Sequence, residues 1–497
     1  MRSAWLAPWL AALALLPACV TEGPTREPAL ERTLAPLGSV PRTVSEGSWP
    51  EPGPGAPDRV LIVSIAGLTP DRYLGDDPDM PVLARLAREG ITGEALVPIR
   101  PDTPFPVHAT LVTGQPPSVH GIVADRLIGE RGVRAVHFWH ASRLTSPTLW
   151  ERARDDRMEV AALGWPSTVG AGIDWLLPEL DATRDTDSWL VLQRQTATPL
   201  LYSAVREAAP AAASTPGSPW PDRAARDGIV ADSACRIAAE PDPPELWLLR
   251  FAGPDPVLRA RGPRHPQAAE AFATADARLA RVLDCLAASG ALAQSAVFVV
   301  GDRALVPVHT AIEPNVWLAG AGLVDLSAEG GAVAAWRALS RSNGGSAFVY
   351  ALDEGAAVEA KRVLSEAAAR TRAFRVVPAT ELQAFRADPQ AWFGLEAARG
   401  FAFGDAAKGG VLHASAERGV AGHLRPDRVG PVGFAAWGQG LRRGIDAPEL
   451  YMEDVAPTVA ALLGLNLGLV DGRIMIGLIE PRQAPSPVSS APGEDEP

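Results

Sequence analysis

Two carboxylates in this sequence stand close to an arginine, and a histidine follows farther along the chain. Asp255 lies four residues before Arg259, and Asp302 directly precedes Arg303. The histidine is His423. Carboxylates and imidazoles are ligands of zinc-class ions, whereas arginine supplies a fixed positive charge that binds carboxylate or phosphate through two parallel hydrogen bonds. These residue types indicate either a metal-assisted site or a site for charged groups.

The elements that would position these residues alternate between buried strands and helices. Residues 60–65 form a continuous apolar run, which is typical of a strand covered on both faces. Further strands are predicted at 160–163, 246–251, 296–300, 347–351 and 432–436, and helices at 81–89, 266–289 and 452–463. The alternation predicts an α/β fold with a mainly parallel central sheet and helices on both faces. Sites in such sheets lie beyond the carboxyl ends of the strands, where Asp255 and Asp302 fall.

The charge of the chain limits its partners. The 497 residues carry a formal net charge of −12, with a pI near 5.3. An acidic protein without a basic run has little nonspecific attraction for nucleic acid. We therefore expect no nucleic-acid partner.

The N-terminus resembles a bacterial lipoprotein signal. Arg2 is followed by an apolar run at 4–16, too short to span a bilayer, and then by Leu16-Pro17-Ala18-Cys19. We predict a signal peptide at 1–18 and lipidation of Cys19. The protein would then be exported and held on the bacterial membrane by its lipid, facing the periplasm or the cell surface. Cleavage and secretion without an anchor is the alternative.

Composition separates the remaining chain into a folded part and two flanking segments. Residues 19–57 are rich in Pro and Gly and predict a tether, and 483–497 predict a disordered tail. The folded domain is expected at 58–482. Within it, Cys235 and Cys285 fall in predicted helices, so we expect two buried thiols, although export would permit a disulfide.

Several short segments keep one order and spacing. They are residues 60–68, 105–114, 117–122, 164–167, 262–263, 299–302 and 421–423. Together they resemble the type I phosphodiesterase/nucleotide pyrophosphatase branch of the alkaline phosphatase superfamily, over about residues 58–472. The resemblance implies an alkaline-phosphatase-like fold. It also implies a centre in which two zinc-class ions clamp a phosphoryl group while a Thr or Ser hydroxyl attacks it.

Comparison with that family indicates that several reactive groups are missing. The first strand of the family ends in a metal-binding Asp, and this chain has Ala66 there. The nucleophile position is Pro104, which has no hydroxyl, and Val107 replaces an Asn that stabilises phosphoryl oxygens. We therefore expect no catalytic residue in the usual sense.

The metal ligands are depleted unequally. One site would keep Asp255 and His423, and the other would keep Asp302 alone, while Arg259 and Arg303 replace two histidines. Zinc sites with fewer than three protein ligands are rare. We therefore expect no metal cofactor; if a zinc-class ion binds, Asp255 and His423 are its ligands.

The two arginines suggest what took the place of the metals. An unpaired buried carboxylate is costly, and we hypothesise that Arg259 and Arg303 neutralise Asp255 and Asp302 in the degenerate pocket. Two alternatives stay open. The arginines could point to solvent, or they could leave a net positive cleft that binds a small anionic or phosphorylated ligand without cleaving it.

Other polar residues near these motifs are expected to be structural. Thr103 precedes the nucleophile position and is predicted to cap the helix that begins at Pro104. His108 and His120 match structural positions of the family. His309 and His413 lie near strand ends, so replacement ligands and ordinary imidazoles are both considered.

Three functions remain to be distinguished. The preferred one is a lipid-anchored member of the family that is inactive or strongly impaired and acts by binding an anion or a partner. The second is an active metal-dependent phosphodiesterase/nucleotide pyrophosphatase with unusual ligands, centred on Asp255 and His423. The third is a purely structural role in the envelope.

Overall fold

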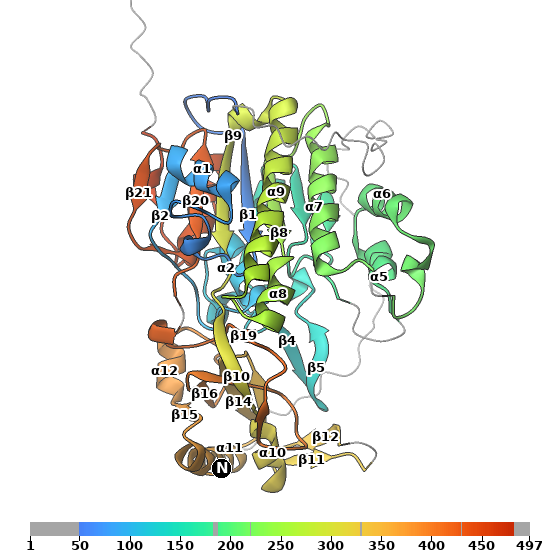
Figure 1. Ribbon diagram of the computed structural model, residues 1–497, viewed down its shortest axis with the longest axis vertical. Helices are drawn as coiled ribbons and strands as arrows, with labels where there is room; N and C mark the ends of the chain where they lie inside the picture. Colours follow the sequence, from blue (N-terminus) through green and yellow to red (C-terminus); the bar gives the residue numbers. More distant parts are fainter. Residues whose placement is uncertain (1–48, 182–186, 219, 329–330, 429, 482–497) are drawn as a thin grey trace, which may run out of the picture. The chain divides into compact units, whose positions relative to one another are not determined.

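The central sheet of the computed structural model contains eight strands (Figure 1). The structure describes residues 49–181, 187–218, 220–328, 331–428 and 430–481. From edge to edge the strands are β21 (Ile445–Ala447), β2 (Ile91–Gly93), β20 (Phe434–Gly438), β9 (Ser295–Gly301), β1 (Arg59–Ile65), β8 (Leu246–Phe251), β6 (Val160–Leu163) and β7 (Trp175–Leu177). The strands from β9 to β7 are parallel, and β20 is antiparallel to β9 and β2. The predicted mainly parallel sheet is confirmed.

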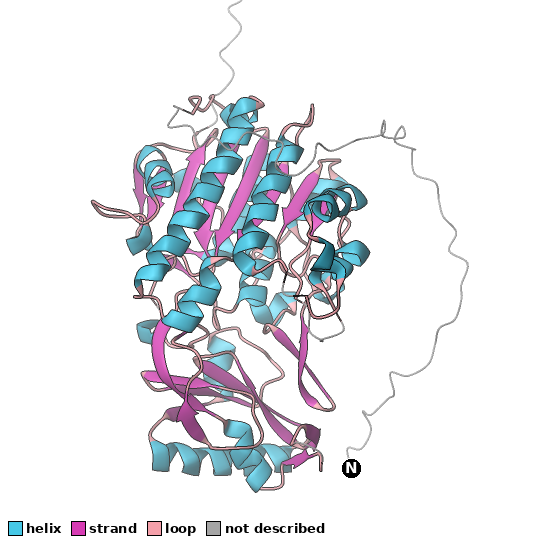
Figure 2. Cartoon of the chain, turned by 45° about the vertical axis from the view of Figure 1, so that its right-hand side comes forward, coloured by secondary structure: helices cyan, strands magenta, loops and turns pink. Residues whose placement is uncertain are grey.

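Helices cover both faces of this sheet because alternate residues of β1 point into two separate cores. Leu61, Val63 and Ile65 belong to one core, and Val60 and Ile62 to the other. The first core is covered by α1 (Pro81–Glu89), α7 (Arg223–Ala238), α8 (Pro254–Arg261) and α9 (Pro266–Ala288). The second is covered by α2 (Pro104–Thr113), α4 (Leu149–Asp155) and α13 (Val455–Leu463). Figure 2 shows helices lying over a face of the central sheet and running roughly along its strands.

A second sheet lies outside the parallel arrangement. It is antiparallel, with the order β13 (Ala338–Ser342), β14 (Ser346–Ala351), β16 (Phe393–Ala397) and β15 (Phe374–Val377). Helices α10 (Pro314–Gly320) and α11 (Glu354–Thr371) pack against it around a core of their own. The strand predicted at 347–351 is therefore real but belongs to this sheet, and the strand predicted at 432–436 is the antiparallel β20.

Shorter elements complete the described chain. A third sheet contains β10 (Val306–Ile312), β17 (Gly400–Phe403), β18 (Leu412–Ala414) and β19 (Gly419–Val420). Two-stranded pairs join β4 (Arg126–Gly129) to β5 (Gly132–His137), β11 (Val324–Leu326) to β12 (Val333–Trp336), and β3 (Leu96–Val97) to β22 (Leu450–Tyr451). The remaining helices are α3 (Pro117–His120), α5 (Trp189–Thr196), α6 (Pro199–Ala208) and α12 (Ala379–Ala384).

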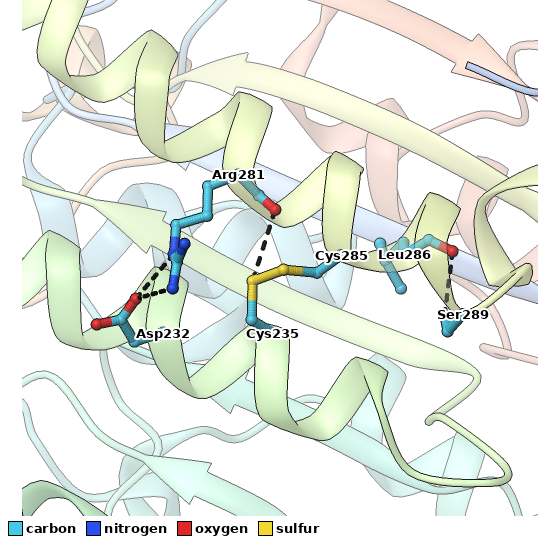
Figure 3. The surroundings of a disulfide bond; sticks show 6 residues. All are labelled: Asp232, Cys235, Arg281, Cys285, Leu286 and Ser289. Carbon is cyan, nitrogen blue, oxygen red and sulfur yellow. Dashed lines mark hydrogen bonds and ion pairs between the residues drawn. A yellow bond between two sulfur atoms is a disulfide. The ribbon is translucent and has the colours of Figure 1, made fainter. Parts of the chain in front are cut away.

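A disulfide joins two helices of the first layer, so the expectation of two buried thiols is wrong. Figure 3 shows the bond between Cys235 of α7 and Cys285 of α9. The Cα atoms of the two residues are 5.2 Å apart. That separation is usual for a disulfide. The helices pack side by side, and an ion pair between Asp232 and Arg281 crosses the same contact. Helical periodicity gives the face that each cysteine occupies, but the pairing depends on how the two helices pack.

The expectations for both ends of the chain lie outside the described residues. These are the signal peptide at 1–18, the lipidated Cys19, most of the tether at 19–57, and the tail at 483–497. Among the helices that the structure describes, none is both long and apolar enough to cross a membrane.

Candidate functional site

Three adjacent strands of the central sheet bring the predicted site residues together. In the order β9, β1, β8, these strands are followed by Asp302, Ala66 and Asp255. A cavity of about 790 Å³ lies here, and its lining includes Pro104, Asp255, Arg259 and Arg303. The cavity therefore occupies the place that the carboxyl ends of parallel strands predict.

At Ala66, where the family resemblance implies a metal-binding carboxylate, the neighbouring backbone bonds Asp302 instead. Ala66 is fully buried, and the N–H of the next residue, Gly67, donates to Asp302 Oδ1 at 2.9 Å. Gly67 has a φ of 73°, and a Cβ there would lie 2.3 Å from the side chain of Leu258. Only glycine fits this turn, and the turn directs a backbone donor at the surviving carboxylate.

Arg303 lies between the two surviving aspartates. Its Nη1 donates to Asp302 Oδ2 at 2.6 Å, and its Nη2 donates to Asp255 Oδ1 at 2.5 Å. The side chain is 1% exposed. Burial alone would lower the pKa of Arg303 and raise that of Asp255, but their mutual attraction reverses both shifts. The Asp255 carboxyl therefore keeps a pKa far below its usual value and stays ionised.

Arg259 supplies a second positive charge to the same carboxylate. It lies one helical turn after Asp255 on α8, and its Nε is 3.1 and 3.2 Å from the two carboxylate oxygens. Its Nη1 donates to Glu417 at 3.1 Å. Asp255, and secondarily Glu417, keep the pKa of Arg259 above its usual value. Neither Arg259 nor Arg303 is directed only at solvent. This excludes the alternative in which both arginines point to solvent.

Further charged residues, which the sequence did not reveal, extend these contacts into a chain of alternating ion pairs. In order, its members are Arg226, Asp181, Arg223, Glu179, Arg250, Asp302, Arg303, Asp255, Arg259 and Glu417. The sequence pointed to one of these residues. Arg250 interrupts the apolar strand 246–251, and a buried arginine requires a carboxylate partner. The loop carboxylates Glu179 and Asp181 carry no such signal.

The charge of the cavity lining is not positive. Seven carboxylates line it: Asp102, Asp125, Glu179, Asp181, Asp255, Asp405 and Glu417. Five arginines face them: Arg126, Arg223, Arg250, Arg259 and Arg303. Because carboxylates outnumber guanidiniums, the lining disfavours the net positive cleft considered for the arginine pair.

The loop before Pro104, the predicted nucleophile position, contains the hydroxyl of Thr103. Helix α2 begins at Pro104, and Thr103 occupies the N-cap position as expected. Its side chain accepts no capping hydrogen bond, however, and the buried Oγ1 has no partner among the described residues. The predicted capping bond is therefore wrong. Thr103 lines the cavity instead, next to Pro104.

His423 lies apart from Asp255. Its Nδ1 is 3.0 Å from Glu396 Oε1, and it lines a separate cavity of about 260 Å³. Within the described ranges no group of three or more His, Cys, Asp or Glu side chains could hold a metal ion. The residues present thus do not fit a zinc-class centre, because Asp255 is bonded by arginines and the imidazole is oriented by another carboxylate.

The other histidines make ordinary contacts. His108 bonds Ser64 and the carbonyl of Pro104, and burial, followed by the charge of Arg250, lowers its pKa well below the usual value. His120 bonds Thr110 and the N–H of Ile122, and burial lowers its pKa to about 3. Both are therefore neutral parts of the core, as expected.

The two histidines considered as replacement ligands lie on β10 and β18. His413 Nε2 is 3.1 Å from Glu313, and His309 Nδ1 is 2.7 Å from the Thr310 hydroxyl. The structure does not bring either one to Asp255 or Asp302, whose described partners are arginines and backbone.

Asp102 should make the stability of the protein depend on pH. It is fully buried, and burial raises its pKa to about 6 even though the Gly422 N–H donates to it at 2.7 Å. In the unfolded chain an aspartate titrates near 3.9. The contribution of Asp102 is therefore fully present below about pH 4 and is lost as the pH rises through about 6.

The variant Asp102→Asn stays neutral and avoids this loss. Relative to wild type, it should gain about 1–1.5 kcal/mol between pH 5 and pH 8, measured from unfolding midpoints at both pH values. Asp76→Asn, at an exposed residue, is the control and should follow wild type. Parallel pH trends for Asp102→Asn and wild type would show that Asp102 is ionised throughout.

Comparisons with known proteins agree on one family and one fold. A sequence model described as type I phosphodiesterase / nucleotide pyrophosphatase matches residues 60–389. Murine ectonucleotide pyrophosphatase/phosphodiesterase 5 superposes with a TM-score of 0.60 at 17% identity, covering 85% of this chain and 100% of that chain. An inactive variant of that murine protein, in complex with AMP, gives 0.59 at 17% identity, with the same coverage. The human protein gives 0.58 at 16% identity, covering 83% and 97%. Curated proteins yield no match.

Proposed function

Because the chain belongs to the type I phosphodiesterase/nucleotide pyrophosphatase family and has an alkaline-phosphatase-like fold, we propose that it is a catalytically inactive or strongly impaired member that acts by binding. One observation carries this proposal. The guanidinium of Arg303 bonds both carboxylates that the family pattern assigns to metal binding.

The arginines replace the metals electrostatically. Two buried carboxylates need positive charge nearby, since an ionised group without a partner is costly in a protein interior. Arg303 and Arg259 supply that charge through short, directed hydrogen bonds. A guanidinium, however, has no vacant coordination position, so it neither activates a hydroxyl nor accepts a phosphoryl oxygen as a Lewis acid. The fold keeps its charge balance without the groups that the reaction requires.

The active alternative has weaker support. It needs Asp255 and His423 to hold one ion, but Asp255 is bonded by Arg303 and Arg259 while His423 bonds Glu396. Thr103, the residue before Pro104, carries a hydroxyl, but that hydroxyl has no base within hydrogen-bonding distance in the described part of the chain.

The large cavity favours a polar ligand that is neutral or cationic. One murine relative was solved with AMP, and a phosphate-type ligand was our expectation from the sequence. The arginines of this cavity are bonded to carboxylates, and carboxylates outnumber them. A phosphate would have to displace those carboxylates, whereas a hydroxyl-rich or amine-bearing molecule would not.

Export and lipid anchoring belong to the same proposal. The segment Leu16-Pro17-Ala18-Cys19 supports lipidation of Cys19. The disulfide between Cys235 and Cys285 supports folding in an oxidising compartment, because cytosolic proteins rarely keep such bonds. Together they favour a protein held on the outer side of a bacterial membrane.

A hydrolysis assay tests the inactivity. We expect purified protein to show no turnover of an aryl phosphodiester above background with added zinc, because no described group of ligands holds the ion and position 104 has no hydroxyl. Turnover is measured by release of the aryl alcohol, and His423→Ala is the matched control. Zinc-dependent turnover that disappears in His423→Ala would establish the active alternative.

Metal content gives an independent readout of the same proposal. Protein purified without added metal should contain zinc far below one equivalent by elemental analysis. Stoichiometric zinc would contradict the assignment of Arg303 and Arg259 as the counter-charges of Asp255 and Asp302.

A further inference from the structure

The cavity lined by His423 has a feature that the contacts of Arg303 with Asp255 and Asp302 do not explain. The Nε2 atom of His423 is buried and has no hydrogen-bond partner within the described chain. The residue is 2% exposed and lines this cavity of about 260 Å³. A buried polar atom without a partner is uncommon in native structures and requires an explanation.

A contact with Glu396 fixes the orientation of the His423 imidazole. His423 Nδ1 lies 3.0 Å from Glu396 Oε1, and the N–H of Leu424 donates to the other carboxylate oxygen at 2.9 Å. Because an ionised carboxylate only accepts hydrogen bonds, Nδ1 carries the proton. Nε2 is then the ring atom left for a ligand. It accepts a hydrogen bond when the ring is neutral and donates one when the ring is protonated.

The lining of this cavity is mainly cationic. Arg264, Arg399 and Arg428 line the cavity, and Asp427 is the one carboxylate among its lining residues. Asp427 also pairs with Arg425 at 2.7 Å, and its oxygen is 3.8 Å from Arg428 Nε, which is buried without a hydrogen-bond partner among the described residues. The structure gives no ion pair for Arg264 or Arg399 in the part of the chain that it describes. This lining has a formal excess of two positive charges, the opposite of the large cavity.

We propose that this cavity, built from His423, Arg264, Arg399 and Arg428, is a binding site for a phosphate group. Guanidiniums provide paired donors for phosphate oxygens. Inorganic phosphate, and a phosphate monoester in its singly charged form, also carry a P–OH, which donates to a neutral Nε2, while the other phosphate oxygens accept from a protonated one. Val306 and Pro307 form an apolar wall beside these groups. The site is separate from the large cavity and does not depend on whether that cavity is catalytic.

Calorimetric titration tests the site, with inorganic phosphate and glycerol 3-phosphate as the probes. Wild-type protein should bind at millimolar concentrations, and the double variant Arg264→Gln/Arg399→Gln should bind roughly tenfold more weakly or worse, since two charge-assisted contacts are lost. Both residues are exposed, so the variant should fold as wild type does. Binding of both probes indicates a site for free phosphate, and binding of glycerol 3-phosphate alone indicates a site for a monoester; either outcome supports the proposal.

Two matched variants locate the binding. Arg370→Gln removes one exposed arginine of α11 and should leave both titrations unchanged. Arg259→Gln removes a guanidinium of the large cavity and should also leave them unchanged. The proposal is overturned if wild type binds neither probe, if the double variant binds like wild type, or if Arg259→Gln abolishes binding.

Discussion

The variant Arg303→Met should unfold at a much lower urea concentration than wild type, with a loss of about 3–5 kcal/mol in the free energy of unfolding. Methionine nearly matches the length of the arginine but removes its charge. Asp255 and Asp302 would each lose their shortest ionic contact in a site that is almost closed to solvent. Removing one partner of a buried ion pair costs more than the pair contributes, because the remaining charge stays buried.

A compensating variant separates charge from packing. Adding Asp255→Asn and Asp302→Asn to Arg303→Met removes the two stranded charges, and the amide oxygen introduced at position 302 still accepts the Gly67 N–H. This triple variant should recover a large part of the lost stability. Arg362→Met, at an exposed arginine of α11, is the control and should unfold within experimental error of wild type. If Arg303→Met also unfolds like wild type, Arg303 is not the counter-charge of the two aspartates.

Removing the disulfide should produce the second large effect. The bond between Cys235 and Cys285 closes a loop with a sequence separation of 50 residues. In the chain-entropy account, a loop of this length contributes about 4 kcal/mol by restricting the unfolded chain. The double variant Cys235→Ala/Cys285→Ala should therefore unfold at a clearly lower urea concentration under oxidising conditions.

Reduction provides the matched control for that experiment. With dithiothreitol, wild type should fall to the midpoint of the double variant, and the variant itself should not change. Thiol labelling of the oxidised, denatured protein should leave Cys235 and Cys285 unmodified. Labelling of both would restore the sequence-based expectation of two free thiols.

Local patterns predicted most elements of the central sheet. The run at 60–65 is apolar throughout because β1 is covered on both faces, and its two sets of alternating residues enter separate cores. The same reasoning placed β6 and β8 correctly. It did not place the strand at 347–351, because an apolar strand of that length fits a parallel or an antiparallel sheet equally well, and the choice depends on the connections around it.

The charged partners of the site could not be predicted in the same way. Glu179 and Asp181 lie between β7 and α5, and Arg223 begins α7, so no periodic pattern connects them with Asp302 or Asp255. Their contacts depend on the path of the chain over the sheet ends. The pairing of His423 with Glu396 has the same origin, since Glu396 lies on β16 and His423 lies 27 positions later in the loop after β19.

The sequence by itself determined which reactive groups are missing from the family pattern. Ala66 offers no ligand atom and Pro104 no hydroxyl wherever they lie, because these are properties of the covalent side chain. Only the tertiary structure decided how the remaining charges are neutralised and which of them face a cavity. An ion pair or a hydrogen bond forms only when two side chains come within a few ångströms. Arg303 and His423 therefore acquired their different surroundings from the fold. Arg303 is enclosed between two aspartates, whereas His423 lines a cationic cavity and has a ring nitrogen without a partner among the described residues.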